Sequence, residues 1–154
     1  MALAKGSTYD NVFYDFVLSP LKNLFKDEFA SSAVYIHPEI KNKGNFEIKL
    51  WGSGATTEDR RQQAWAKIYN ISVEIYLREA NPNEKFYEIL YLRAERAYQL
   101  LFNNITKETT VGSTTLTWID GEVGEMLINE FNEGEEEIDG LNKITLDFSC
   151  IIER

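Results

Sequence analysis

The stretch Tyr69-Asn70-Ile71-Ser72-Val73-Glu74-Ile75-Tyr76-Leu77-Arg78 alternates apolar and mostly polar side chains with a period of two. Successive side chains of a β-strand point to opposite faces of a sheet, so the pattern predicts a strand with one apolar face. A sheet has this pattern when one face is covered and the other meets water. We therefore expect the fold to be built around this strand.

The segments before the central strand predict a helix and two further strands. Apolar residues spaced by one, three and four positions predict a kinked helix, or two short ones, over Thr8–Phe29, interrupted at Pro20. Strands are expected at Ala33–His37 and Asn45–Trp51. The polar segment Gly52–Gln63 begins with glycines and lacks an apolar period, so it predicts a long loop.

A second helix is expected after the central strand. Asn81 suits the N-cap, Pro82 the first helical position and Glu84 the first turn. Apolar residues at helical spacing continue from there, and the helix is expected over Pro82–Asn103.

The C-terminal third of the chain predicts three strand segments. Ser113–Ile119 and Glu122–Ile128 are expected to form a hairpin around Asp120-Gly121, a dipeptide typical of tight turns. The acidic segment Asn129–Gly140 should repel itself and form an exposed loop. The last strand places five apolar side chains on one face: Ile144, Leu146, Phe148, Cys150 and Ile152.

Together these elements predict an α+β fold with the order α-β-β-β-α-β-β-β. We expect a mixed or mainly antiparallel sheet with two helices packed on one face. The length of 154 residues and the 44% hydrophobic content fit one domain over residues 1–154. The longest apolar runs are four residues, as in Ile89–Leu92, so no membrane-spanning helix is expected.

The net charge of −9 is confined to the end of the chain. Asp120–Arg154 holds 11 acids and 2 bases, whereas Met1–Ile119 holds 14 of each. Proteins that grip DNA or RNA use a basic patch that releases counterions from the phosphates. The acidic excess therefore argues against nucleic-acid binding and leaves passive repulsion of nucleic acid open.

The residues needed for common catalytic and metal sites are missing. His37 is the only histidine and is expected in a turn, and Cys150 is expected as a small buried hydrophobe. No Cys/His cluster for zinc is present, and the Asn129–Gly134 segment lacks the first acidic ligands of a calcium loop. We expect a protein that is not an enzyme and that uses no metal or cofactor.

The layout resembles the tail terminator (tail-completion) proteins of long-tailed bacteriophages, the lambda type. The resemblance is one of organisation over nearly the whole chain. It includes the long strand Ile68–Tyr76, the helical segment Ala94–Leu101 and the closing strand Ile144–Arg154.

The resemblance implies a structural protein of the virion tail or neck, assembled in the host cytoplasm. Such a protein forms a ring, usually a hexamer, on the head-proximal end of the tail tube. The ring ends tube polymerisation and forms the joint to the head connector or neck protein. DNA would pass through the ring without specific binding, and no membrane is involved.

Two groups of residues are candidates for contacts in such an assembly. The interface candidates are Arg60 and Arg61 in the expected polar loop, and Tyr76 and Arg78 on the wetter face of the central strand. The acidic candidates for the lumen or a ring face are Glu133, Glu135, Glu136, Glu137 and Asp139. Solubility is the rival explanation for these acids.

Two alternatives remain open. One is another phage neck or head–tail joining protein, which shares the class but occupies a different position. The other is a small α+β ligand-pocket protein, which would need a concave apolar cavity with a few convergent polar groups.

Overall fold

Six strands form one sheet in the computed structural model, which describes residues 10–30, 33–36, 46–60, 65–79, 83–133 and 136–153. The spatial order is β1-β2-β3-β6-β5-β4. The strands are β1 (Ala33–Ile36), β2 (Phe46–Arg60), β3 (Trp65–Arg78), β4 (Lys107–Val111), β5 (Thr114–Glu133) and β6 (Glu136–Glu153). Only the β1–β2 pair is parallel among these strand pairs.

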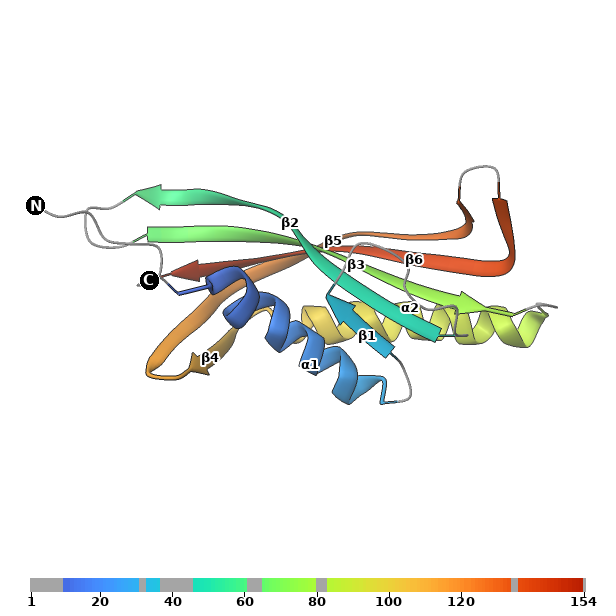
Figure 1. The fold of residues 1–154 in the computed structure, drawn as a ribbon, viewed down its shortest axis with the longest axis horizontal. Helices are drawn as coiled ribbons and strands as arrows, with labels where there is room; N and C mark the ends of the chain where they lie inside the picture. The colour runs from blue at the N-terminus through green and yellow to red at the C-terminus, as the bar shows by residue number, and fades with distance from the viewer. Residues whose placement is uncertain are drawn as a thin grey trace, which may run out of the picture.

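Both helices of the described residues lie on the same side of the long central strands (Figure 1). They are α1 (Ser19–Glu28), which continues a π-helical segment η2 (Phe13–Leu18), and α2 (Glu84–Phe102). The expected α+β fold, with a mainly antiparallel sheet and helices on one face, is confirmed, and the order of elements roughly matches. Neither helix is both long enough and apolar enough to cross a membrane.

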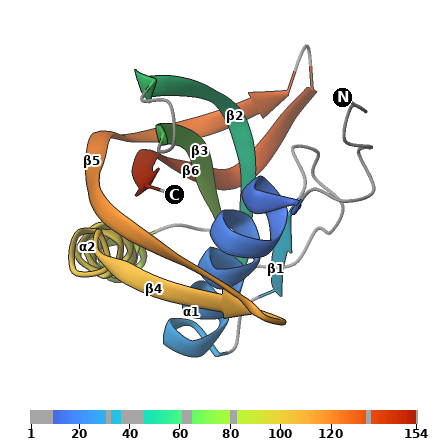
Figure 2. The same ribbon diagram turned by 90° about the vertical axis from the view of Figure 1, so that its left-hand side faces the viewer.

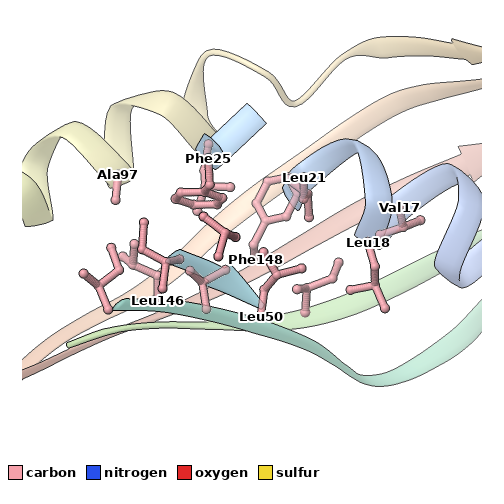
Figure 3. Close-up of a cluster of buried hydrophobic side chains, with 14 of the residues drawn as sticks. Val17, Leu18, Leu21, Phe25, Leu50, Ala97, Leu146 and Phe148 are labelled. Atoms are coloured by element: carbon pink, nitrogen blue, oxygen red, sulfur yellow. The ribbon is translucent and has the colours of Figure 1, made fainter. Parts of the chain in front are cut away.

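The core lies between the helices and one face of the sheet. The odd-numbered residues Ile71, Val73 and Ile75 of β3 are at most 1% exposed. Their neighbours on β6 are Phe148, Leu146 and Ile144, which are also buried. Figure 3 shows α1 and α2 covering this layer with Leu21, Phe25 and Ala97, among others. The alternation in the central strand therefore sets the inner face, as expected.

The N-terminal helix is one continuous helix whose first part is wound as a π-helix. Proline has no N–H, so Pro20 cannot donate to the Phe16 carbonyl four residues earlier. That carbonyl instead accepts a buried hydrogen bond of 2.9 Å from Trp118 Nε1 of β5. The predicted helix is confirmed, and the irregularity at Pro20 is satisfied by a residue distant in the sequence.

The second helix begins later than the sequence predicted. Its N-cap is Asn83, which has extended backbone angles and whose Oδ1 accepts a 3.0 Å hydrogen bond from the Phe86 N–H. The predicted cap, Asn81, lies outside the described residues. Asn83 is an equally good capping residue. It is the residue that lies next to the first turn.

The predicted loop at Gly52–Gln63 is wrong for residues 52–60, because β2 continues to Arg60. This part of β2 pairs with the first half of β3, from Arg60↔Trp65 to Gly52↔Ile71, with bulges on the way. Its exposed side chains include Ser53, Ala55 and Thr56. A strand that is wet on both faces carries no apolar alternation. Residues 61–64 lie outside the described residues.

The predicted hairpin at Asp120-Gly121 is also wrong, because β5 runs straight through it. The turn is instead at Gly112-Ser113, between β4 and β5, where Gly112 has the positive φ of +61° that tight hairpin turns need. A glycine is needed at position 121 for another reason: a Cβ atom there would lie 2.7 Å from the Ser149 carbonyl oxygen. Close strand approach, not a turn, explains this glycine.

The acidic segment Asn129–Gly140 is not a loop along its described length. β5 extends to Glu133 and β6 starts at Glu136, with Glu133 opposite Glu136 and Asn132 opposite Glu137. This β5–β6 hairpin lies at the opposite end of the sheet from the C-terminus and turns away from the helices (Figure 1). Backbone pairing with a long neighbouring strand overrides the like-charge repulsion that predicted a loop.

Candidate interaction surface

The face of the sheet that points away from the helices is polar along its centre. We call it the polar sheet face. It carries Ser53, Asn70, Ser72, Glu74, Tyr76, Glu122, Lys143, Asp147 and Ser149, which alternate with the buried core positions of β2, β3, β5 and β6. The same alternation that builds the core therefore builds this surface on its other side.

A shallow hollow of about 550 Å³ lies on the polar sheet face. Serine and asparagine side chains make up most of its polar lining. Its two ionisable lining residues are Glu122 and Asp147, both exposed. The lining therefore presents negative charge, which repels phosphate groups.

A compact charged cluster lies further along the same face. The Tyr76 hydroxyl donates a hydrogen bond to Glu74 Oε2, and Lys143 Nζ lies 3.8 Å from Glu74 Oε1. The Lys49 ammonium lies 4.8 Å from the centre of the Tyr76 ring. Lys49 is 0% and Tyr76 is 4% exposed, so these groups tie β2, β3 and β6 together.

The predicted interface residues that the structure describes lie at opposite ends of the sheet. Tyr76 is buried in the charged cluster, and Arg78 is half-buried, with its Nε atom making no hydrogen bond in the described structure. Arg60 ends β2 at the other end of the sheet, and only its backbone is described. Arg61 lies outside the described residues. Their role in an interface stays a prediction.

The acidic candidates lie on the β5–β6 hairpin. Glu133 ends β5, while Glu136, Glu137 and Asp139 belong to the start of β6. Glu135 lies outside the described residues. The structure thus gathers the described acids at one end of the sheet, on a paired ribbon, and their function stays a prediction.

The sheet has two long open edges within the described strands. β1 pairs with β2 only as far as Leu50, so the outer side of β2 has no described partner strand over 51–60. β4 pairs with β5 only from Thr114 to Trp118, which leaves the outer side of β5 open toward the β5–β6 hairpin. Unpaired strand edges are templates for pairing with another chain.

Two arginines that the sequence pattern did not single out join α2 to the rest of the fold. The Arg96 guanidinium lies 4.7 Å from the Phe29 ring centre and forms a 2.9 Å ion pair with Glu28. The Arg93 guanidinium lies 3.9 Å from the Phe46 ring centre. Burial lowers the pKa of Arg93, and the nearby Arg96 charge lowers it further. Only the tertiary contacts distinguish these arginines from a solvated helix face.

Cys150 is fully buried on the helix side of β6, as expected. Burial raises the pKa of its thiol from 9.0 to about 12, so the nucleophilic thiolate is suppressed. No group of three metal-ligating side chains occurs among the residues with described positions. His37 lies outside them. Trp118 is a core residue at 1% exposure, and Trp51 is half-buried.

Comparison with known proteins identifies a similar fold and no sequence family. No protein-family model matches the chain, and no curated protein matches it either. A solved structure titled "Virion of native gene transfer agent (GTA) particle" contains a chain with a similar fold, at a TM-score of 0.53. The sequences are 11% identical, and the match covers 84% of each chain. The likeness therefore establishes a shared fold.

Proposed function

We propose that this chain is a structural protein of a phage-like particle that caps a tail tube as a ring. The observation that carries the proposal is the fold shared, over most of both chains, with a chain from a gene transfer agent virion. The resemblance of the sequence to tail terminators gives the finer assignment. In this role the ring ends tube growth and forms the joint to the head connector.

The open edges of the sheet provide a physical route to a ring. β2 and β5 lie on opposite sides of the four-stranded part of the sheet, and each has a long stretch without a described partner strand. If the β2 edge of one copy meets the β5 edge of the next, the contact is head-to-tail. Head-to-tail contacts generate a closed ring when the rotation between copies closes.

The acidic polar sheet face suits a surface past which DNA must slide. Its hollow is lined by two exposed carboxylates among serine and asparagine side chains. Like charge repels the phosphates and prevents the counterion release that drives binding. The open form and the mixed polar and apolar lining of this hollow differ from the concave apolar cavity that the ligand-pocket alternative needs.

The proposal is tested by measuring the mass of the full chain by light scattering after size exclusion, over a series of concentrations and salt. We expect a closed species of about six copies, favoured by high salt because each copy carries −9. Electron microscopy should show a central hole. If only monomers form, polymerising tube protein is added, and the chain must then shorten or cap the tubes. Tubes of unchanged length would exclude the proposal.

A pair of variants tests whether the β2 edge makes the ring contact. Thr57→Lys places a charge on the open stretch of β2, which opposes edge pairing. Gln99→Lys adds the same charge on the exposed face of α2. We expect Thr57→Lys to abolish the ring and Gln99→Lys to retain it. Loss of the ring in both variants would indicate a general charge effect.

A further inference from the structure

A second groove lies between α1 and β4, away from the polar sheet face. We call it the α1–β4 groove, and it has a volume of about 370 Å³. Asp15, Asn23 and Asp27 line it from the helical side, and Lys107, Thr109 and Val111 line it from β4. Figure 2 shows β4 crossing in front of α1 at the near end of the molecule.

The strand that borders this groove, β4, is an edge strand of the sheet. β4 pairs only with β5 among the described strands, from Val111↔Thr114 back to Lys107↔Trp118. In a two-residue hairpin the residues that flank the turn exchange hydrogen bonds, and such pairs then alternate along the ribbon. The backbone N–H and C=O groups of Glu108 and Thr110 therefore point away from β5, to the free edge.

The groove also contains a buried polar atom without a partner. Thr109 is 9% exposed, and its Oγ1 atom is buried without a hydrogen bond in the described structure. An unsatisfied buried hydroxyl is destabilising, so native proteins rarely leave one. Because Thr109 lines the groove, a group that enters the groove can reach this hydroxyl.

The charges around the groove favour a positively charged occupant. Asp15, Asp27 and Glu108 are acidic, and Lys107 is the single basic side chain among the described lining residues. Pro20, Leu24 and Val111 add apolar contacts, and Val111 is 41% exposed. An extended peptide added to an edge strand places alternate side chains toward such a groove.

We propose that the α1–β4 groove binds an extended, basic segment of a partner protein, which pairs with β4 as an additional strand. The backbone of Glu108 and Thr110 provides the hydrogen bonds, and the acids of the groove select Lys or Arg. The proposal goes beyond the capping function and does not depend on it, because the ring contacts proposed above involve β2 and the open part of β5.

The test is a selection of random heptapeptides displayed on a carrier, using the full chain as bait. We expect enriched peptides to carry Lys or Arg at alternate positions. Their binding is then measured with synthetic copies against Glu108→Pro and Glu108→Ala. Proline removes the N–H that points to the free edge without removing a bond to β5, and such a proline is tolerated at a sheet edge. Glu108→Ala loses the same side chain and keeps the N–H.

Glu108→Pro should weaken binding at least tenfold relative to Glu108→Ala. A second pair of variants keeps the backbone intact: Asp27→Lys should weaken binding at least tenfold, and Glu95→Lys, on the exposed face of α2, should not. Equal binding to both members of either pair would overturn the proposal, as would enrichment of acidic peptides or of none. Self-association that Glu108→Pro abolishes would assign the edge to a second copy and would also overturn it.

Discussion

The two faces of the central strands β3 and β6 differ in what surrounds their side chains. On the helix side, Val73 and Leu146 are fully buried against helices. On the polar sheet face, Asp147 and Ser149 of the same strand β6 line an open hollow. The helix side therefore carries the hydrophobic core, whereas the part of the polar sheet face around the hollow is open to contacts with other molecules.

Thiol reactivity should differ most between the faces. Cys150 faces the core, and its pKa of about 12 lowers the thiolate fraction at pH 8 by about a thousandfold relative to a pKa of 9.0. The matched variant is Ser149→Cys in a Cys150→Ala background, which moves the thiol to the polar sheet face. We expect slow labelling by a thiol reagent in the native protein and fast labelling in the variant. Equal rates would contradict the assignment of the faces.

The raised pKa also predicts how stability depends on pH. The folded state retains the Cys150 proton after the unfolded thiol has ionised, so this thiol makes the free energy of unfolding fall above about pH 9. The loss should continue toward the folded pKa of about 12. Cys150→Ala should show a shallower decline in denaturant titrations over this range.

Removal of the Trp118 side chain should lower the free energy of unfolding by about 3–5 kcal/mol. The variant Trp118→Ala leaves a cavity, and it deprives the Phe16 carbonyl of its hydrogen bond. Ile119→Ala is the control, because Ile119 is 43% exposed, and it should cost about 1 kcal/mol or less. Urea titration measures both. Similar losses would indicate that Trp118 is not an anchor of the core.

An alanine in place of a glycine that meets the core should lower the free energy of unfolding by about 1–3 kcal/mol more than one on the polar sheet face. In Gly52→Ala, the new Cβ would lie 2.3 Å from the Phe13 ring, so the ring, η2 or β2 must shift. In Gly124→Ala, the nearest atom is at 3.5 Å, an ordinary contact on the polar sheet face. Thermal unfolding should therefore show a clear loss only for Gly52→Ala. Phe13→Ala should reduce the penalty of Gly52→Ala, and an undiminished penalty would reject this clash.

The Lys143–Glu74 ion pair should contribute the least to the free energy of unfolding, below about 1 kcal/mol. Its 3.8 Å separation is long, and the side chains are 26% and 14% exposed. Lys143→Met should lower stability slightly, and the loss should shrink with added salt. Lys85→Met removes a more exposed pair with Glu88 and should have no measurable effect. A loss above 2 kcal/mol would make the charged cluster a main support of the fold.

The sequence predicted those elements in which one face of the element is covered. The alternation in β3, the apolar face of β6 and the helical spacing in α2 all correspond to one buried side. One error lies where neither face is covered, because the described side chains of β2 from Gly52 to Thr57 are mostly exposed. The second half of β2 and the β5–β6 hairpin are strands because of their pairing partners, and a pairing partner leaves no local period in the sequence.

The candidate functional residues show the same limit, because contacts between distant segments leave no local signal in the sequence. Residue type alone indicated that Cys150 is inert and that the acids gather near the C-terminus. It could not indicate that Tyr76 is buried beside Lys49, because that contact joins β2 to β3. Nor could it indicate that Arg93 and Arg96 lie over aromatic rings of segments distant in the sequence.

By itself, the sequence determined the inner face of the sheet, the two helices and the acidic end of the chain, because side-chain period and charge are local properties. The tertiary structure decided the strand order, the lengths of β2 and β5, the satisfaction of the Phe16 carbonyl by Trp118, and the groove beside β4. Each of these depends on pairing or packing between residues far apart in the chain, and such contacts follow from the geometry of the whole fold.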